Sequence, residues 1–185
     1  MPKYFTEPEN IKDGFIEIFS DEAKHILNVM RMEIGDTLTI CDGQSNDYLC
    51  RICETGKNCL KAKIEETTKS ESEPKTKITL YQGLPKSDKM ELIIQKCVEI
   101  GVCRIVPVIT ERAVVKIEKG AKEDKKTERW QKIAESAAKQ SGRGCIPEVA
   151  PLHTFAEALE SAKQADCGVF LYEGGGIRFS EVPLT

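Results

Sequence analysis

The sequence predicts a two-part fold, a small β-barrel followed by an α/β domain built on a parallel sheet. In the first seventy residues, short runs of β-branched, aromatic or alternating residues are separated by turns. After a polar segment at 65–74, strand and helix patterns alternate, which is typical of a parallel sheet covered by helices. We take 65–74 as the linker and expect domains at 1–72 and 73–185.

Strands dominate the expected N-terminal part, at 14–19, 37–41, 47–53 and 59–64. Turn sequences such as Asp42-Gly43 separate them. One helix interrupts the strands and starts at Ser20, a residue type that favours the N-cap position. Its apolar residues follow at helical spacing: Ala23, Ile26, Leu27 and Met30.

Alternating strands and helices are expected in the C-terminal part. The strand patterns lie at 78–82, 104–109 and 166–172. Between the first two, Asp88 and Glu91 form a capping pair for a helix that ends at Gly101. Ligands of a parallel sheet bind beyond the carboxyl ends of its strands, so we expect a site there.

Two further helices are expected. One spans 127–139 and keeps its basic residues away from an apolar stripe, which consists of Trp130, Ile133, Ala134, Ala137 and Ala138. The other begins at Thr154, which forms a capping pair with Glu157.

The composition fits one medium domain or two small ones. The chain has 185 residues, of which 40% are hydrophobic and 31% charged, so it can bury a core. No apolar run approaches the ~20 residues of a membrane helix, and the N-terminus lacks the apolar stretch of a secretory signal. We therefore expect a cytoplasmic protein with no membrane partner.

Charge is distributed unevenly along the chain. The net charge of −3, taken whole, argues against a nucleic-acid partner. However, residues 1–74 carry 9 Lys and Arg against 15 Asp and Glu, residues 75–145 carry 16 against 9, and residues 146–185 carry 2 against 6. The basic middle provides one surface able to meet phosphate, although a merely solvated helix face at 116–132 would explain the same charge.

The eight cysteines are expected to be reduced thiols, because nothing in the sequence exports the chain. Cys50 and Cys53 have the spacing of a zinc knuckle. A knuckle needs a tight turn, whereas 48–53 reads as a strand, in which residues three apart point to opposite faces. We expect small buried hydrophobes rather than a metal site.

Several enzyme classes are disfavoured. The glycine run at 174–176 is not a dinucleotide-binding fingerprint, and the turn at 83–87 lacks the phosphate-loop lysine pattern. His25 and His153 lie far apart in sequence, and no Ser or Cys sits in a nucleophile elbow. A Rossmann dehydrogenase, a P-loop enzyme and a hydrolase with a triad therefore have no support.

Three polar clusters remain at the ends of expected elements. They are Lys86 with Lys89, Glu111 with Arg112, and Gln140-Ser141-Gly142-Arg143. Each alone has an ordinary explanation as surface charge, an ion pair or a helix end. Together they predict a site for phosphate and base, since Arg and Gln offer directional donors that solvation does not require.

The sequence resembles the family of bacterial ribosomal RNA small subunit methyltransferase E. The matching segments are 84–102 (LPKSDKMELIIQKCVEIGV), 111–114 (ERAV), 128–134 (ERWQKIA), 140–143 (QSGR), 2–5 (PKYF) and 25–31 (HILNVMR). The resemblance runs in order over the whole chain. It implies a PUA-like RNA-binding barrel, a SPOUT-type α/β domain with a trefoil knot, and a homodimer.

The resemblance also implies an activity, methyl transfer from S-adenosylmethionine to N3 of one uridine in 16S rRNA on the assembled small subunit, with no metal. N3 of uracil must lose its proton as the methyl arrives, so the site must align the reactants and assist deprotonation. No residue is identified as the catalytic base. The RNA-binding residues that the resemblance implies are Lys3, Arg31, Lys86, Lys89, Arg112, Arg129, Gln140, Ser141 and Arg143.

For the cofactor, the resemblance implies Leu171, Tyr172 and Glu173. The family continues with a glycine-rich loop and a later segment that supply most of the cofactor pocket and the knot, and neither occurs in this sequence. We therefore expect the 185 residues alone to have an incomplete knot. A smaller departure is Lys3, where the family more often has Arg, so charge is kept and bidentate geometry is lost.

Two functions remain open, an S-adenosylmethionine-dependent uridine N3-methyltransferase and an RNA-binding module or fragment without chemistry. A zinc-dependent RNA binder is a third idea. The resemblance favours the enzyme. The zinc-dependent RNA binder would require stoichiometric metal in the purified protein.

Overall fold

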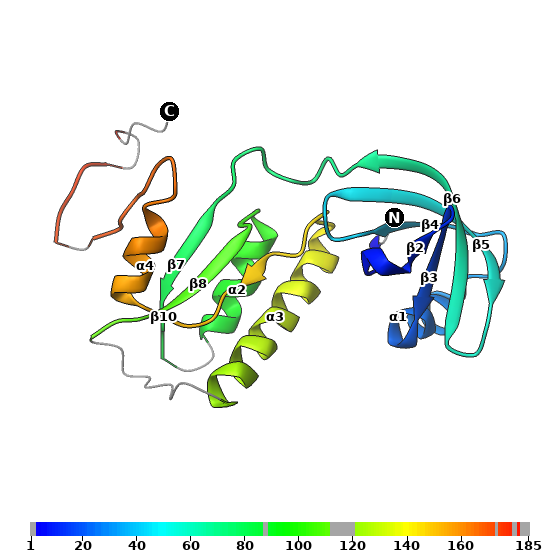
Figure 1. The fold of residues 1–185 in the computed structure, drawn as a ribbon, viewed down its shortest axis with the longest axis horizontal. Coiled ribbons are helices and arrows are strands. Elements are labelled where there is room, and N and C mark those ends of the chain that lie inside the picture. The colour runs from blue at the N-terminus through cyan, green and yellow to red at the C-terminus, as the bar shows by residue number, and fades with distance from the viewer. Residues whose placement is uncertain (1–2, 87–88, 112–120, 173, 179–180, 182–185) are drawn as a thin grey trace.

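The computed structural model describes residues 3–86, 89–111, 121–172, 174–178 and 181. Two sheets are found in this part of the chain, a six-stranded one near the N-terminus and a four-stranded one after it. They lie on opposite sides of a long helix, α3, as Figure 1 shows. The predicted change from a mainly β region to a region in which strands and helices alternate is confirmed.

The N-terminal sheet has the strand order β1-β4-β5-β6-β3-β2. Its strands are β1 (Lys3–Phe5), β2 (Ile11–Lys12), β3 (Phe15–Phe19), β4 (Thr37–Cys41), β5 (Asn46–Thr55) and β6 (Cys59–Lys69). All neighbours are antiparallel except β1 and β4. The four predicted strands are confirmed, β1 and β2 were missed, and closure into a barrel stays a prediction.

Alternation along these strands explains their core. Ile16 and Ile18 of β3 are buried while Glu17 between them is exposed, and Leu38 and Ile40 of β4 repeat the pattern. The buried side chains form one cluster that also takes in Ala23 and Ile26 of the helical segment, so the strands and the helix share a single core.

The N-terminal part contains three short helical pieces: η1 (Pro8–Asn10), α1 (Ser20–Lys24) and the π-helical turn η2 (His25–Val29). Of these, α1 and η2 form the helix predicted from Ser20 onward. Ser20 differs from the expectation, because it is the first helical residue, with φ of 60°, and α1 has no side-chain cap. The helix ends at Arg31, whose φ of 55° is the left-handed conformation usual for glycine at that place.

The C-terminal sheet is parallel throughout, as predicted. β8 (Arg104–Ile109) lies at its centre, with β7 (Thr79–Gly83) on one edge. The short strands β9 (Glu148–Val149) and β10 (His153–Thr154) follow one another along the other edge of β8, and the sequence did not predict them. β8 is almost wholly apolar because helices cover both of its faces.

Three helices flank this sheet. α2 (Lys89–Glu99) and α3 (Ala121–Ser141) pack on one face, and α4 (Phe155–Ala162) packs on the other (Figure 1). The predicted stripe of α3 is confirmed, since Trp130 and the three alanines are buried and Ile133 packs against them. The Thr154–Glu157 capping pair is confirmed as a capping box, whereas the pair at Asp88 lies outside the described residues.

Two expectations are wrong. Residues 65–69 of the predicted linker belong to β6, because the β5–β6 hairpin continues its pairing to Lys69. The run 166–172 forms no strand, and no described strand pairs with it. Its apolar side chains are exposed instead, Leu171 to 85%.

Among the described residues, no helix is both long and apolar enough to cross a membrane. The same residues include no group of three or more His, Cys, Asp or Glu that could hold a metal ion.

Candidate RNA interface

Helix α3 presents a basic face opposite its buried stripe. Lys125, Arg129 and Lys132 are exposed, and Lys139 is half-buried near the end of the helix. Their spacing of four, three and seven residues keeps them on one side of an α-helix, away from Trp130 and Ala134. A row of cations at this spacing suits a nucleic-acid backbone better than an isolated surface lysine does.

Two of these cations are already engaged. Arg129 Nη2 lies 2.7 Å from Glu91 Oε1 in the first turn of α2. Lys139 Nζ lies 2.7 Å from Glu22 Oε2 in α1, so it joins α3 to the N-terminal part. Neither glutamate was predicted as a partner. Lys125 and Lys132 form no ion pair with a described residue and remain available to phosphate.

The carboxyl edge of the parallel sheet holds two of the three predicted clusters. Lys86 follows β7, and Lys89 begins α2; both are exposed. Glu111 follows β8 and is exposed as well, while Arg112 lies outside the described residues. This edge is where ligands of parallel sheets bind, so the placement agrees with the sequence prediction.

The third cluster lies at the other edge. Helices that cover a parallel sheet run back against the strands, so α3 ends at the amino edge. Ser141 is about 18 Å along α3 from Arg129, at 1.5 Å per residue. Gln140 is exposed there, and the Ser141 hydroxyl donates to Ala137 O at 2.7 Å within the helix. The expectation that all three clusters form one site is therefore wrong.

In the N-terminal part, Lys3 and Arg31 occupy different environments. Lys3 Nζ pairs with Asp47 Oδ2 at 2.7 Å and donates to Ser70 Oγ at 2.8 Å, which ties β1 to β5 and to the segment after β6. Arg31 is exposed, and it makes no ion pair within the described part of the chain. Arg31 is the better placed of the two for a ligand.

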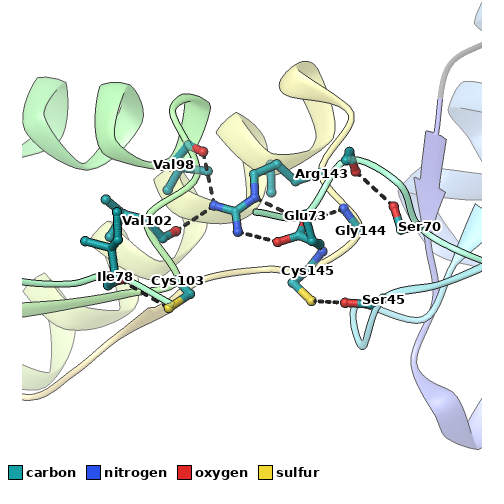
Figure 2. Close-up of polar contacts among 12 residues, drawn as sticks. Ser45, Ser70, Glu73, Ile78, Val98, Val102, Cys103, Arg143, Gly144 and Cys145 are labelled. Carbon is teal, nitrogen blue, oxygen red and sulfur yellow. Dashed lines mark hydrogen bonds and ion pairs between the residues drawn. The ribbon is translucent and has the colours of Figure 1, made fainter. Parts of the chain in front are cut away.

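Arg143 corrects the sequence expectation. Its side chain is only 3% exposed, and its donors are used inside the protein (Figure 2). Nη1 donates to Val98 O at 3.1 Å and Val102 O at 2.6 Å, and Nη2 lies 2.6 Å from Glu73 Oε2. A guanidinium held in this way is withdrawn from RNA.

Glu73 is the residue that sequence reasoning missed. Its Oε1 accepts from Arg143 Nε at 3.2 Å, Gly144 N at 2.7 Å and Cys145 N at 3.0 Å. Burial acts to raise the pKa of Glu73, but these hydrogen bonds and the charge of Arg143 outweigh it and hold the pKa below its usual value. Glu73 lies in the polar segment that was predicted to be the linker, and no sequence signal distinguishes it from the other glutamates there.

The predicted cofactor residues lie in the irregular stretch after α4. Leu171 is 85% exposed and Tyr172 67% exposed, and Glu173 is outside the described residues. Val169 and Phe170 just before them are exposed too. The described part of the chain thus shows an uncovered apolar run at the position where the resemblance implies cofactor contacts.

Cys50 and Cys53 lie on β5, as predicted. Cys50 Sγ donates to Tyr48 O and Cys53 Sγ to Lys61 O, so the two sulfurs have separate partners. Burial raises the pKa of Cys50 to about 12, and that of Cys41 to about 12 for the same main reason. Both thiols behave as buried apolar groups.

Comparison with known proteins relates both parts of the chain to RNA methyltransferases. Residues 71–185 match the family model described as an RNA methyltransferase domain, and residues 20–65 match the RNA methyltransferase PUA domain. These two matches fall on the C-terminal and N-terminal sheets respectively.

Individual relatives agree with the family models. Ribosomal RNA small subunit methyltransferase E of Bacillus subtilis is 36% identical over 176 residues, which are 94% of this chain and 68% of that protein. The protein of the same name from Synechocystis is 30% identical, and the match covers 83% of this chain and 48% of that protein. The chain thus spans between about half and two thirds of these two relatives.

A solved structure gives the same answer. The Neisseria gonorrhoeae ribosomal RNA small subunit methyltransferase E, bound to S-adenosylmethionine, has a TM-score of 0.74 and 35% identity, and the match covers 86% of this chain and 65% of that one. The fold of this chain is therefore similar to that of the solved protein over most of the chain. The chain belongs to the ribosomal RNA small subunit methyltransferase E family.

Proposed function

We propose that this chain acts in S-adenosylmethionine-dependent methylation of small-subunit ribosomal RNA, and that the acceptor is N3 of a uridine in 16S rRNA within the assembled subunit. The observation that carries the proposal is the family match over both parts of the chain, in order. The basic face of α3 supports it, because RNA binding needs a positive field despite the net charge of −3.

The cofactor would supply an electrophilic methyl group on a sulfonium. The test of fit is the chemistry of the uncovered run: Leu171 and Tyr172 are apolar and aromatic groups exposed to 85% and 67%, and such side chains suit the flat adenosine moiety. We propose that Leu171, Tyr172 and Glu173 hold the cofactor. The trefoil knot and the homodimer implied by the resemblance belong to the same proposal.

The RNA would be held by cations of both parts. We propose that Lys86, Lys89, Arg112 and Arg129 bind the RNA backbone at the carboxyl edge, where α2 begins. Arg31 and Lys3 would bind from the N-terminal part, and Gln140 and Ser141 would lie along the path between the two parts. We further propose that residues 1–72 bind RNA and residues 73–185 carry the methyl-transfer site.

The work of these residues is to hold one uracil in line with the methyl donor and to favour loss of its N3 proton. Cations around the site would favour the N3 anion over the neutral base, so they would lower the free energy needed to pass the N3 proton to water as the methyl group arrives. Exclusion of water around the aligned atoms would strengthen the same interactions.

A thermal-shift experiment separates the enzyme from an RNA-binding module. S-adenosylhomocysteine in large excess is expected to raise the melting temperature of a polypeptide that carries this chain together with the family's glycine-rich loop, since a ligand that binds only the folded state stabilises it by mass action. Adenosine at the same concentration is the control. An unchanged melting temperature, together with retained binding to 16S rRNA, would replace the enzyme by the module for this chain.

A further inference from the structure

The segment that joins the two sheets is packed into the protein. Residues 70–74 follow β6, and two glycines of the C-terminal part make room for them. A Cβ on Gly144 would lie 2.3 Å from Ser70 Cβ, and a Cβ on Gly101 would lie 2.4 Å from Pro74 Cγ. Since real Cβ atoms do not approach so closely, both positions require glycine while the segment stays where it is.

Between Ser70 and Pro74, Glu73 is held at both carboxylate oxygens. Arg143 binds it through two nitrogens, and the backbone N–H groups of Gly144 and Cys145 complete its partners (Figure 2). A bidentate pair with added N–H donors is the geometry in which a buried carboxylate is well compensated. The joining segment is therefore fastened to the loop that follows α3.

The same guanidinium fastens this loop to α2. Arg143 Nη1 donates to the carbonyls of Val98 and Val102, which lie in the last turn of α2 and just after it. Carbonyls at the end of a helix lack partners within the helix and carry partial negative charge, so a cation there is favourable. One side chain thus links the joining segment, the α3 loop and α2.

The N-terminal sheet adds its own contacts to the loop. Ser45 N donates to Gly144 O at 3.0 Å, and Cys41 Sγ donates to the same oxygen at 3.0 Å. Ser45 Oγ lies 2.7 Å from Cys145 Sγ. These atoms lie in the loop after α3, at the end of β4 and in the turn between β4 and β5, so they form one compact set of hydrogen bonds between the two parts.

We propose that Glu73 and Arg143 are positioning residues, which fix the RNA-binding part against the methyltransferase part so that RNA held by one presents its uridine to the other. The inference rests on the proposed function. This positioning role replaces the RNA contact that the sequence predicted for Arg143. The contacts of Glu73 hold the joining segment against the loop that follows α3.

The proposal predicts a specific kinetic signature. If the target uridine is displaced by about 1 Å from its productive geometry, the rate of methyl transfer can fall by about 10²-fold. The same displacement leaves the RNA phosphate contacts within each part unchanged. In Arg143→Lys and Glu73→Gln, we expect kcat for methyl transfer to small subunits to fall by up to about 10²-fold. The Kd for 16S rRNA should stay that of the parent.

Two measurements make the test independent of activity. Spin labels on non-canonical residues at the exposed positions 12 and 96 report the distance between the two parts. Hydrogen exchange at the Gly144 and Cys145 amides reports the Glu73 contacts. Both variants should give a broader distance distribution and faster exchange. Rates are corrected for the folded fraction seen by circular dichroism.

The matched control is Arg104→Lys. Arg104 Nε lies 3.1 Å from Glu148 Oε2, and this pair joins β8 to β9 within a single sheet. The Arg104→Lys variant should leave the distance distribution between the spin labels and the kcat for methyl transfer unchanged. If the parent protein transfers no methyl group, the proposed function fails. The distance and exchange data would still show whether Glu73 and Arg143 hold the two parts together.

Three results would overturn the proposal. One is a distance distribution that stays narrow in Arg143→Lys and Glu73→Gln. Another is a broadened distribution with parental kcat and KM, which would mean that the joint exists but does not position the RNA. A loss of RNA affinity with parental kcat would restore Arg143 to the RNA-binding residues and overturn it equally.

Discussion

Glu73 and Arg143 stand 70 residues apart in the sequence and form a two-point ion pair, with Oε2 2.6 Å from Nη2 and Oε1 3.2 Å from Nε. Their side chains are 16% and 3% exposed. The pair lies where the two parts of the chain meet, so it contributes to holding them together, as the Lys139–Glu22 pair does.

The first prediction concerns the stability of this joint. Arg143→Met should lower the free energy of unfolding by about 3–5 kcal/mol, because it leaves the largely buried Glu73 carboxylate without its charged partner. Urea denaturation followed by circular dichroism measures the change. Arg104→Met, which breaks a more exposed pair, should cost about 0–1 kcal/mol. If the two variants lose equal amounts of unfolding free energy, the Arg143–Glu73 pair contributes no more to stability than the exposed Arg104–Glu148 pair.

The second prediction concerns pH. The pKa of Glu73 is depressed in the folded protein, so its contribution to stability is complete above its ordinary value of 4.5 and is lost as pH falls through the lower folded value. The difference in stability between the parent and Glu73→Gln should therefore be constant from pH 6 to 8 and shrink below about pH 4.5. A difference that grows on acidification would contradict the ion pair.

The third prediction concerns the close approach at Gly144. Gly144→Ala should destabilise the protein by about 1–3 kcal/mol, because the new methyl group overlaps Ser70. Replacing Ser70 by Gly in the same chain should recover part of the loss. Gly83→Ala is the control, since its Cβ would meet Thr110 Cγ2 at an ordinary 3.6 Å. No recovery in the double variant would mean that Ser70 is not the obstacle.

The fourth prediction concerns RNA binding by α3. Lys132→Ala should weaken binding to 16S rRNA and reduce the slope of log Kd against log salt by about 1, the effect of one lost phosphate contact. Filter binding at several salt concentrations measures this. Lys163→Ala, after α4 on the other face of the sheet, should change neither quantity. Identical behaviour of the two variants would exclude the basic face of α3 from the interface.

The fifth prediction concerns the thiols. Cys167 is exposed, whereas burial holds the pKa of Cys41 and of Cys50 at about 12. Iodoacetamide at pH 8 should therefore alkylate Cys167 well before Cys41 and Cys50, which should react only after unfolding. Peptide mass spectrometry locates the label. Rapid alkylation of Cys50 in the native protein would contradict the buried strand.

The sequence predicted the architecture well where side chains repeat with a clear period. β3 and β4 alternate buried and exposed residues, and α3 has an apolar stripe at helical spacing, so local pattern and tertiary burial agree. The prediction failed for β1, β2, β9 and β10, each of two or three residues. Such strands exist only because a longer neighbour supplies their hydrogen bonds, and no local pattern carries that information.

The site was harder to predict for the same reason. Lys86, Lys89 and Arg129 could be singled out, since charge and element ends are visible in the sequence, and their role in RNA binding stays a prediction. Arg143 could not be assigned correctly, because an arginine that binds phosphate and one that binds a distant glutamate look alike in the sequence. The run at 166–172 misled because an apolar stretch predicts burial, whereas the described residues offer it no partner.

The most direct test of the central claim is transfer of labelled methyl from S-adenosylmethionine to small ribosomal subunits that lack the modification, followed by identification of the product nucleoside. We expect the label to appear as N3-methyluridine in 16S rRNA. Label on another nucleoside would contradict the proposed acceptor. Absence of label, with RNA binding intact, would leave this chain an RNA-binding member of its family and contradict the proposed activity.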